Sequence, residues 1–184
     1  LGGGIPSGYC VLVAGPSGSG KTVLSNQFII EGVERGETAI VAVFEKRPND
    51  YLQTTPQGAT FERLVAEKKI QILYLRPLDL SVDDAPEEIR KSVAELGATR
   101  VVLDSISGFE MALAPTFRED FRESLYRLIG ALTGLGVTMF STVEVAEGNE
   151  GLRLTGYQVS FLTDDILSQR YVEIEGELRK ALVV

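Results

Sequence analysis

The sequence predicts an α/β protein with three layers, in which helices cover both faces of a mostly parallel sheet. Three observations lead to this prediction. Apolar strand-like runs alternate with helix-like runs along most of the chain, which is typical of a parallel sheet. A glycine-rich segment, residues 15–22, joins the first strand-like run to the first helix-like run. The C-terminal region instead has consecutive strand-like runs, so we expect antiparallel strands to complete the sheet.

The strand-like runs are rich in valine, isoleucine and leucine and show little alternation of apolar and polar residues. This composition indicates strands that are buried on both faces. We expect parallel strands over residues 9–14, 38–44, 70–75, 100–104 and 137–142. In the tail we expect strands over residues 165–169, 170–175 and 177–184, with a tight turn at Glu175-Gly176-Glu177.

Helix-like segments separate the parallel strands. We expect them over residues 21–34, 82–96 and 118–132, with a broken helical stretch over 49–67. In the 82–96 segment apolar residues recur at helical spacing, and the acidic residues near its start favour a helix N-terminus. Pro56 and Gly58 should interrupt the 49–67 stretch, and Gly97 and Gly136 are expected to follow helix ends.

Length and composition favour one domain with an ordinary globular core. The chain has 184 residues, a formal net charge of −8, one cysteine and no histidine. The acidic balance and the lack of a cationic run disfavour nucleic-acid binding, and the missing histidine disfavours a zinc site. Cys10 cannot form an internal disulfide, and it is expected to be a buried core residue.

No apolar run approaches the roughly 20 residues of a membrane span, and we expect no signal peptide, so we expect a cytoplasmic protein. The chain starts at Leu1 and ends within the apolar residues 181–184. We therefore expect residues 1–184 to be a single domain that is a fragment of a longer chain.

Residues 15–22, GPSGSGKT, fit the phosphate-loop pattern G-x-x-x-x-G-K-[ST] at every fixed position. In this motif, glycines let successive backbone N–H groups face a polyphosphate, and the following helix adds its positive N-terminus. Lys21 should reach the β- and γ-phosphates, and Thr22 should offer its hydroxyl to Mg²⁺. The predicted nucleotide-binding residues are Pro16, Ser17, Gly18, Ser19, Gly20, Lys21 and Thr22.

Two acidic residues follow apolar strands and should lie at the carboxyl edge of the same sheet. Asp104 ends the run VVLD and is the expected second Mg²⁺ residue. Glu45 ends the run VAVFE, on a strand that can lie beside the phosphate-loop strand or one place away, and it is placed to polarise a water attacking the γ-phosphate. The alternative for Glu45 is a solvated side chain paired with Lys46 or Arg47. Ser141 and Thr142 end the next strand and could sense the γ-phosphate through a hydroxyl.

These motifs together resemble the KaiC-type ATPase domains of the RecA-like superfamily. The resemblance rests on LGGGIPSG at 1–8, GPSGSGKT at 15–22, Phe44-Glu45, and VVLDSIS at 101–107, and it covers nearly the whole chain. It implies a RecA-like P-loop fold, ATP binding with Mg²⁺, and homo-oligomeric rings, usually hexamers, with ATP at subunit interfaces. It also implies a switching or signalling role, clock-like in some members, with signalling proteins as partners.

The chain departs from the family pattern at several positions. The family typically has two adjacent glutamates after the second strand; Glu45 matches the first, and Lys46 replaces the second. The resemblance also implies trans-acting basic residues after the last strand, and we expect these to lie beyond Val184. Ser160 matches a serine that accepts phosphate in the clock protein's autokinase domain, but Phe161 replaces the adjacent threonine. We therefore favour an ordinary loop serine over an autokinase acceptor.

Three functions compete on this evidence. The first is a Mg²⁺-dependent ATPase in a ring, with Glu45 and Lys21 as catalytic residues. The second is a nucleotide-gated assembly module with little turnover, motivated by Lys46. The third is a RecA- or RadA-type DNA-dependent motor, which the net charge disfavours.

Overall fold

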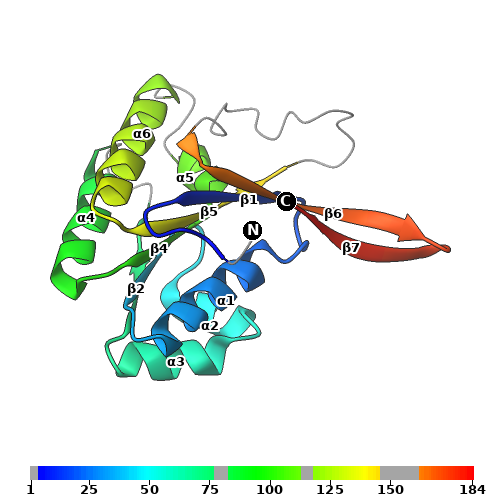
Figure 1. The fold of residues 1–184 in the computed structure, drawn as a ribbon, viewed down its shortest axis with the longest axis horizontal. Helices are drawn as coiled ribbons and strands as arrows, with labels where there is room; N and C mark the ends of the chain where they lie inside the picture. Colours follow the sequence, from blue (N-terminus) through cyan, green and yellow to red (C-terminus); the bar gives the residue numbers. More distant parts are fainter. Residues whose placement is uncertain (1–3, 77–82, 113–117, 146–161) are drawn as a thin grey trace.

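The computed structural model describes residues 4–76, 83–112, 118–145 and 162–184, and in them helices pack on both faces of one sheet (Figure 1). The sheet has the strand order β3-β2-β4-β5-β1-β6-β7, and every neighbouring pair is parallel except β6 and β7. The strands are β1 (Cys10–Gly15), β2 (Ala39–Val43), β3 (Ile70–Tyr74), β4 (Arg100–Asp104), β5 (Thr138–Glu144), β6 (Asp165–Ile174) and β7 (Glu177–Val183). The helices are α1 (Lys21–Glu34), α2 (Pro48–Thr54), α3 (Gly58–Ala66), α4 (Asp84–Leu96), α5 (Ile106–Ala112) and α6 (Arg118–Gly134). The predicted fold class, an α/β RecA-like arrangement with an antiparallel C-terminal strand pair, is confirmed.

The sheet separates two hydrophobic cores, because successive residues of a strand point to opposite faces. On one face, Leu12 of β1 and Leu103 of β4 pack with residues of α4, α5 and α6. On the other face, Val11 of β1 and Val102 of β4 pack with residues of α1, α2 and α3. All six residues of β1 are buried, as expected for a central parallel strand.

Three details differ from the sequence-based expectation. The strand carrying Glu45 is neither beside β1 nor one place away, because β4 and β5 both lie between β2 and β1. The two strands expected over 165–169 and 170–175 are one continuous strand, β6, whose first part pairs in parallel with β1. Helix α5 was not predicted, and it follows Asp104 after a single residue. The interruption around Pro56 is confirmed, since α2 ends at Thr54 and α3 begins at Gly58.

The β6–β7 hairpin extends beyond the rest of the sheet (Figure 1). Only residues 165–168 of β6 pair with β1, whereas the hairpin pairs over residues 168–183. Glu175 and Gly176 form its turn with positive φ angles of 55° and 77°. The base of the hairpin therefore lies beside the end of β1, next to the glycine-rich loop.

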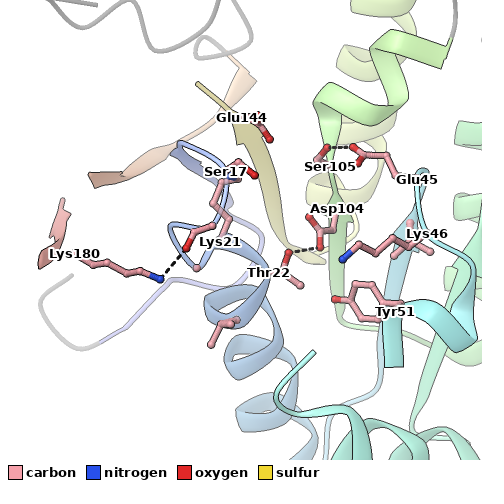
Figure 2. A pocket seen from close by; sticks show the side chains of 14 residues that line it. Ser17, Lys21, Thr22, Glu45, Lys46, Tyr51, Asp104, Ser105, Glu144 and Lys180 are labelled. Carbon is pink, nitrogen blue, oxygen red and sulfur yellow. Dashed lines mark hydrogen bonds between the residues drawn. The ribbon is translucent and has the colours of Figure 1, made fainter. Parts of the chain in front are cut away.

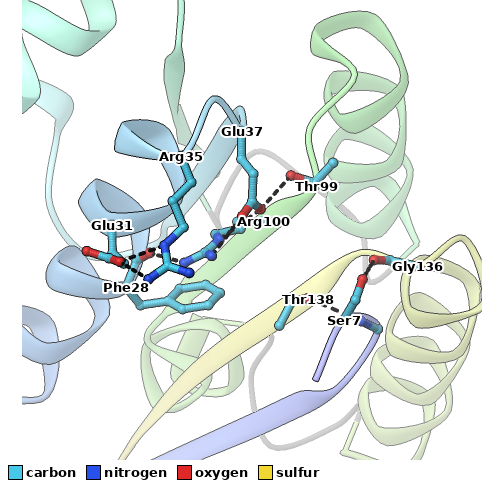
Figure 3. Close-up of polar contacts among 10 residues, drawn as sticks. Ser7, Phe28, Glu31, Arg35, Glu37, Thr99, Arg100, Gly136 and Thr138 are labelled. Carbon is cyan, nitrogen blue, oxygen red and sulfur yellow. Dashed lines mark hydrogen bonds and ion pairs between the residues drawn. The ribbon is translucent and has the colours of Figure 1, made fainter. Parts of the chain in front are cut away.

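At the amino ends of the parallel strands, Arg100 at the start of β4 ties three segments together (Figure 3). Its guanidinium donates two hydrogen bonds to the Glu37 carboxylate, at 2.9 and 2.8 Å. A third goes to the backbone oxygen of Phe28 at 2.5 Å, and the Phe28 ring lies 4.5 Å from the guanidinium carbon. These contacts fix the C-terminal half of α1 and the start of β2 against β4. The pKa of Glu37 is lowered chiefly by its hydrogen bonds with Arg100.

In the part of the chain that the structure describes, no helix is both long and apolar enough to cross a membrane. Ser160 and Phe161, which carry the autokinase comparison, lie outside the described residues.

Candidate functional site

The glycine-rich loop connects β1 to α1, as the motif requires. Gly20 precedes α1 with φ of 112°, a conformation that a residue with a side chain rarely adopts. Gly15 leaves no room for a side chain, because a Cβ there would lie 2.8 Å from the Gln169 backbone oxygen. The loop thus presents backbone and the N-terminus of a 14-residue helix at the carboxyl edge of the sheet. This geometry suits a polyphosphate.

Lys21 lies within the loop that precedes it. Its ammonium donates hydrogen bonds to the backbone oxygens of Gly15 and Pro16, each at 2.9 Å. Burial lowers the pKa of Lys21, while the carboxylates of Glu144, Asp104 and Glu45 oppose that shift. Both carbonyl acceptors are neutral, so the ammonium can exchange them for phosphate oxygens without breaking an ion pair.

Asp104 is held between two threonine hydroxyls. Thr22 donates to one carboxylate oxygen at 2.8 Å, and Thr142 donates to the other at 2.6 Å. These three residues come from α1, β4 and β5, which meet at one point of the sheet edge (Figure 2). The structure therefore brings together the two residues expected to hold Mg²⁺.

The donor set fits a magnesium ion that is bound together with a nucleotide. Mg²⁺ prefers oxygen ligands and commonly takes one or two protein groups, with phosphates and waters completing its shell. Thr22 and Asp104 offer a hydroxyl and a carboxylate oxygen. Across the described residues, no group of three or more His, Cys, Asp or Glu side chains could hold a metal ion by itself. Such a site would need the nucleotide's oxygens to complete it.

Glu45 is fixed by the residues that follow Asp104. Ser105 donates its hydroxyl hydrogen to Glu45 Oε1 at 2.9 Å, and the Gly108 N–H donates to Ser105 Oγ at 2.9 Å. Helix α5, which the sequence analysis missed, thus orients Glu45 through Ser105. Among the described residues, neither Lys46 nor Arg47 lies within 4.0 Å of a Glu45 carboxylate oxygen. The alternative interpretation was a solvated glutamate paired with Lys46 or Arg47; Glu45 is indeed exposed, but neither ion pair is formed.

These groups surround one pocket of about 380 Å³ (Figure 2). Loop and helix residues form one side, Asp104 and Ser105 form the middle, and Glu45 and Tyr51 lie on the far side. Of the predicted site residues, the pocket wall contains Ser17, Gly18, Gly20, Lys21, Thr22, Glu45 and Asp104. Pro16 and Ser19 belong to the same loop but do not line this pocket.

Besides Ser105, sequence reasoning missed four titratable side chains of the pocket wall: Lys46, Tyr51, Glu144 and Lys180. Glu144 ends β5 as Asp104 ends β4, so the same strand-end argument could have identified it. Tyr51 donates its hydroxyl hydrogen to Asn26 Oδ1 of α1 at 2.6 Å, and burial raises its pKa. No sequence signal marks Tyr51, because its position depends on how α2 packs against α1.

The base of the β6–β7 hairpin also contacts the loop. Gln169 accepts a hydrogen bond from the Ser19 hydroxyl at 3.0 Å, and Tyr171 donates to the Ser17 backbone oxygen at 3.4 Å. Lys180 donates to the Gly18 backbone oxygen at 2.7 Å. The hairpin therefore supports the phosphate loop from the side opposite to Asp104.

The two hydroxyls at the end of β5 have different surroundings. Thr142 lies on the α1 face, where it contacts Asp104. Ser141 is fully buried, and its side chain projects to the other face of the sheet, with Met139 and Val143. The expectation that Ser141 senses a phosphate is therefore wrong, whereas Thr142 is in place to act through Asp104.

The comparison with known proteins agrees with this site. A family model described as "ATPase: KaiC" matches residues 1–184. The circadian clock oscillator protein KaiC of Picosynechococcus sp. is 28% identical over 184 residues, which is all of this chain and 35% of that protein. KaiC 1 of Synechocystis sp. is also 28% identical, over the same shares of the two chains. The circadian clock protein KaiC3 of Synechocystis sp. is 27% identical over 175 residues, 95% of this chain and 34% of that protein.

The chain thus spans about a third of the length of these relatives. The family model covers every residue, including the phosphate loop, Asp104 and Glu45. The chain belongs to the KaiC ATPase family.

Proposed function

We propose that this chain binds ATP together with Mg²⁺ and hydrolyses it, with Lys21 and Glu45 as catalytic residues. The observation that carries the proposal is the shared pocket, in which a phosphate loop, the Thr22–Asp104 pair and the Glu45 carboxylate face one another. Such a set is suited to phosphoryl transfer, where catalysis depends on positioning and on charge stabilisation.

Each residue has a distinct task in this proposal. The loop N–H groups and the Lys21 ammonium bind the phosphate oxygens and stabilise negative charge on them. Thr22 and Asp104 would hold Mg²⁺, which neutralises charge on the phosphates. Thr142 holds Asp104 in place. Glu45, oriented by Ser105, accepts a hydrogen bond from the attacking water and polarises it.

Nucleotide binding and hydrolysis by wild type and Lys21→Ala test this proposal. We expect wild type to bind ATP and release phosphate, and we expect Lys21→Ala to lose both by more than about tenfold. Gly20 and Thr22 remain in the variant, so its fold is expected to persist. Equal ATP affinity of the two proteins would contradict a phosphate-binding role for this loop.

We further propose that the protein assembles into homo-oligomeric rings, hexamers by resemblance to the family, with nucleotide between subunits. Strand β7 supports this proposal, because it is an edge strand on which Leu178 and Leu182 are 71% and 52% exposed. Light scattering with and without ATP tests it, and a monomer under both conditions would contradict it. A switching role with protein partners, clock-like as in the relatives' names, rests on resemblance. A cytoplasmic location stays an expectation from the sequence.

A second candidate is a nucleotide-gated assembly module with little turnover. Lys46 favours it, because it stands where the family typically has the second of two adjacent glutamates, so this chain has one carboxylate there instead of two. ATP-dependent assembly without phosphate release would support this candidate over the ATPase. A DNA-dependent motor is disfavoured by the net charge of −8. Autokinase activity is supported only by the resemblance of the segment at Ser160.

A further inference from the structure

Lys46 lies in the wall of the candidate pocket, next to the side where Mg²⁺ would be held. It follows β2 directly after Glu45, and its side chain points from there toward Thr22 and Asp104 (Figure 2). Lys21 approaches from the loop on the other side of Asp104. The proposed metal position is therefore flanked by two ammonium groups.

The position of the Lys46 ammonium is fixed by a neutral partner. It donates a hydrogen bond to Thr54 Oγ1 at 3.1 Å, and the Thr54 hydroxyl in turn donates to the backbone oxygen of Asp50 at 2.8 Å. Within the described parts of the chain, no carboxylate oxygen lies within 4.0 Å of this ammonium. Its positive charge is thus held at the pocket without being paired.

Lys46 determines whether the ionisable groups of the pocket wall carry a net charge. The wall carries three carboxylates, of Glu45, Asp104 and Glu144, and three ammonium groups, of Lys21, Lys46 and Lys180. Lys21 and Lys180 are hydrogen bonded to carbonyl oxygens of the loop itself. Lys46 is the ammonium on the opposite side, and it brings the formal charge of these six groups from −1 to zero.

We propose that Lys46 binds the polyphosphate directly and supplies part of the charge neutralisation that Mg²⁺ otherwise provides. This proposal rests on the proposed nucleotide-binding function. It has two linked consequences. Lys46 raises the affinity for metal-free nucleotide, and it weakens the binding of Mg²⁺ to the protein–nucleotide complex through charge repulsion. Because the binding cycle closes, the ratio of the ATP dissociation constants without and with Mg²⁺ equals the factor by which the protein raises the affinity of ATP for Mg²⁺, so this ratio reports the second effect.

The test of this proposal is the affinity of the purified protein for nucleotide with and without Mg²⁺. A fluorescent ATP analogue serves as the probe, and its dissociation constant is measured in excess Mg²⁺ and in excess EDTA. The ratio of the EDTA value to the Mg²⁺ value is compared for wild type and Lys46→Gln. We expect the ratio to rise about tenfold in Lys46→Gln, which is the order of magnitude for charges several ångströms apart near a protein surface. Lys46→Arg, which keeps the charge, should retain the wild-type ratio.

Two controls make the result specific. Lys91→Gln removes the same charge from an exposed position on α4, outside the pocket, and should leave the ratio unchanged. Lys21→Ala should weaken ATP binding by more than about tenfold under both conditions. If wild type binds no nucleotide, or binds it without needing Lys21, the proposed function itself fails.

If wild type binds ATP through Lys21 but Lys46→Gln has the wild-type ratio, the inference about Lys46 is overturned while the proposed function stands. An equal loss of affinity with and without Mg²⁺ gives that unchanged ratio and also overturns it. A raised ratio in Lys46→Gln together with the wild-type ratio in Lys46→Arg would support the inference.

Discussion

Replacing Gly108 by alanine should displace the proposed catalytic carboxylate without weakening the fold. A Cβ at this position would lie 2.4 Å from Glu45 Oε1, 2.7 Å from its Cγ and 2.9 Å from its Cδ. An ordinary contact needs about 3.4 Å, so the end of the Glu45 side chain must retreat by roughly 1 Å. Glu45 is exposed, so its side chain can move aside at the cost of its hydrogen bond from Ser105.

The same substitution should not destabilise α5. Gly108 lies within the helix at a position that alanine can adopt, and alanine favours helix by up to about 1 kcal/mol over glycine. By contrast, a misplacement of about 1 Å at a reacting group costs up to roughly 100-fold in rate. We therefore expect kcat for ATP hydrolysis to fall about 10- to 100-fold, with the melting temperature unchanged or slightly raised.

Steady-state phosphate release and thermal unfolding measure the two effects. Gly130→Ala in α6 is the matched control, because a Cβ there meets nothing within 4 Å, and it should keep wild-type kcat. In a Glu45→Gln background, Gly108→Ala should have no further effect on kcat, since both changes act on one group. A Gly108→Ala protein with wild-type kcat would refute the role that we assign to Glu45.

Three further predictions concern the rest of the molecule. Thr142→Val removes the 2.6 Å hydrogen bond to Asp104, so the Mg²⁺ concentration for half-maximal hydrolysis should rise by about tenfold, with kcat largely restored at saturating Mg²⁺. Glu37→Gln should lower the free energy of unfolding by about 1–2 kcal/mol at pH 7, measured with urea, because the carboxylate pairs with Arg100. Because the pKa of Glu37 is lowered in the folded protein, the unfolded chain takes up the proton first as the pH falls. The difference in unfolding free energy between wild type and Glu37→Gln should therefore shrink through the usual pKa range of a glutamate and below. A difference that is independent of pH would contradict this prediction. Burial raises the pKa of Cys10 to about 12, so its thiol should resist Ellman's reagent at pH 8 in the folded protein and react once urea unfolds it; rapid reaction of the native protein would contradict its burial.

Much of the site could be predicted from local sequence patterns. The phosphate loop is a contiguous motif, so Lys21 and Thr22 needed no knowledge of distant contacts. Asp104 followed from a general property of parallel sheets, whose carboxyl ends meet at one edge. These are the residues that the structure brings into one pocket.

The remainder depends on packing between segments that are distant in sequence. Strand order could not be derived from the strands themselves, and β2 lies farther from β1 than expected because β4 and β5 insert between them. Helix α5 is short and contains Gly108, so its sequence has weak helical periodicity. Ser105, directly before the helix, nevertheless orients Glu45. The contact of Lys180 with the loop arises from a hairpin about 160 residues away, for which no local pattern exists.

The measurement that tests the account most directly is single-turnover hydrolysis of Mg²⁺-ATP by wild type and Glu45→Gln, with the ATP affinity of both proteins measured in parallel. The account predicts equal affinity and a rate that falls by about 100-fold or more in Glu45→Gln, because the amide cannot polarise the attacking water as the carboxylate does. Equal rates of hydrolysis at equal affinity would contradict the central claim that Glu45, held by Ser105 across the pocket from Lys21, activates the water.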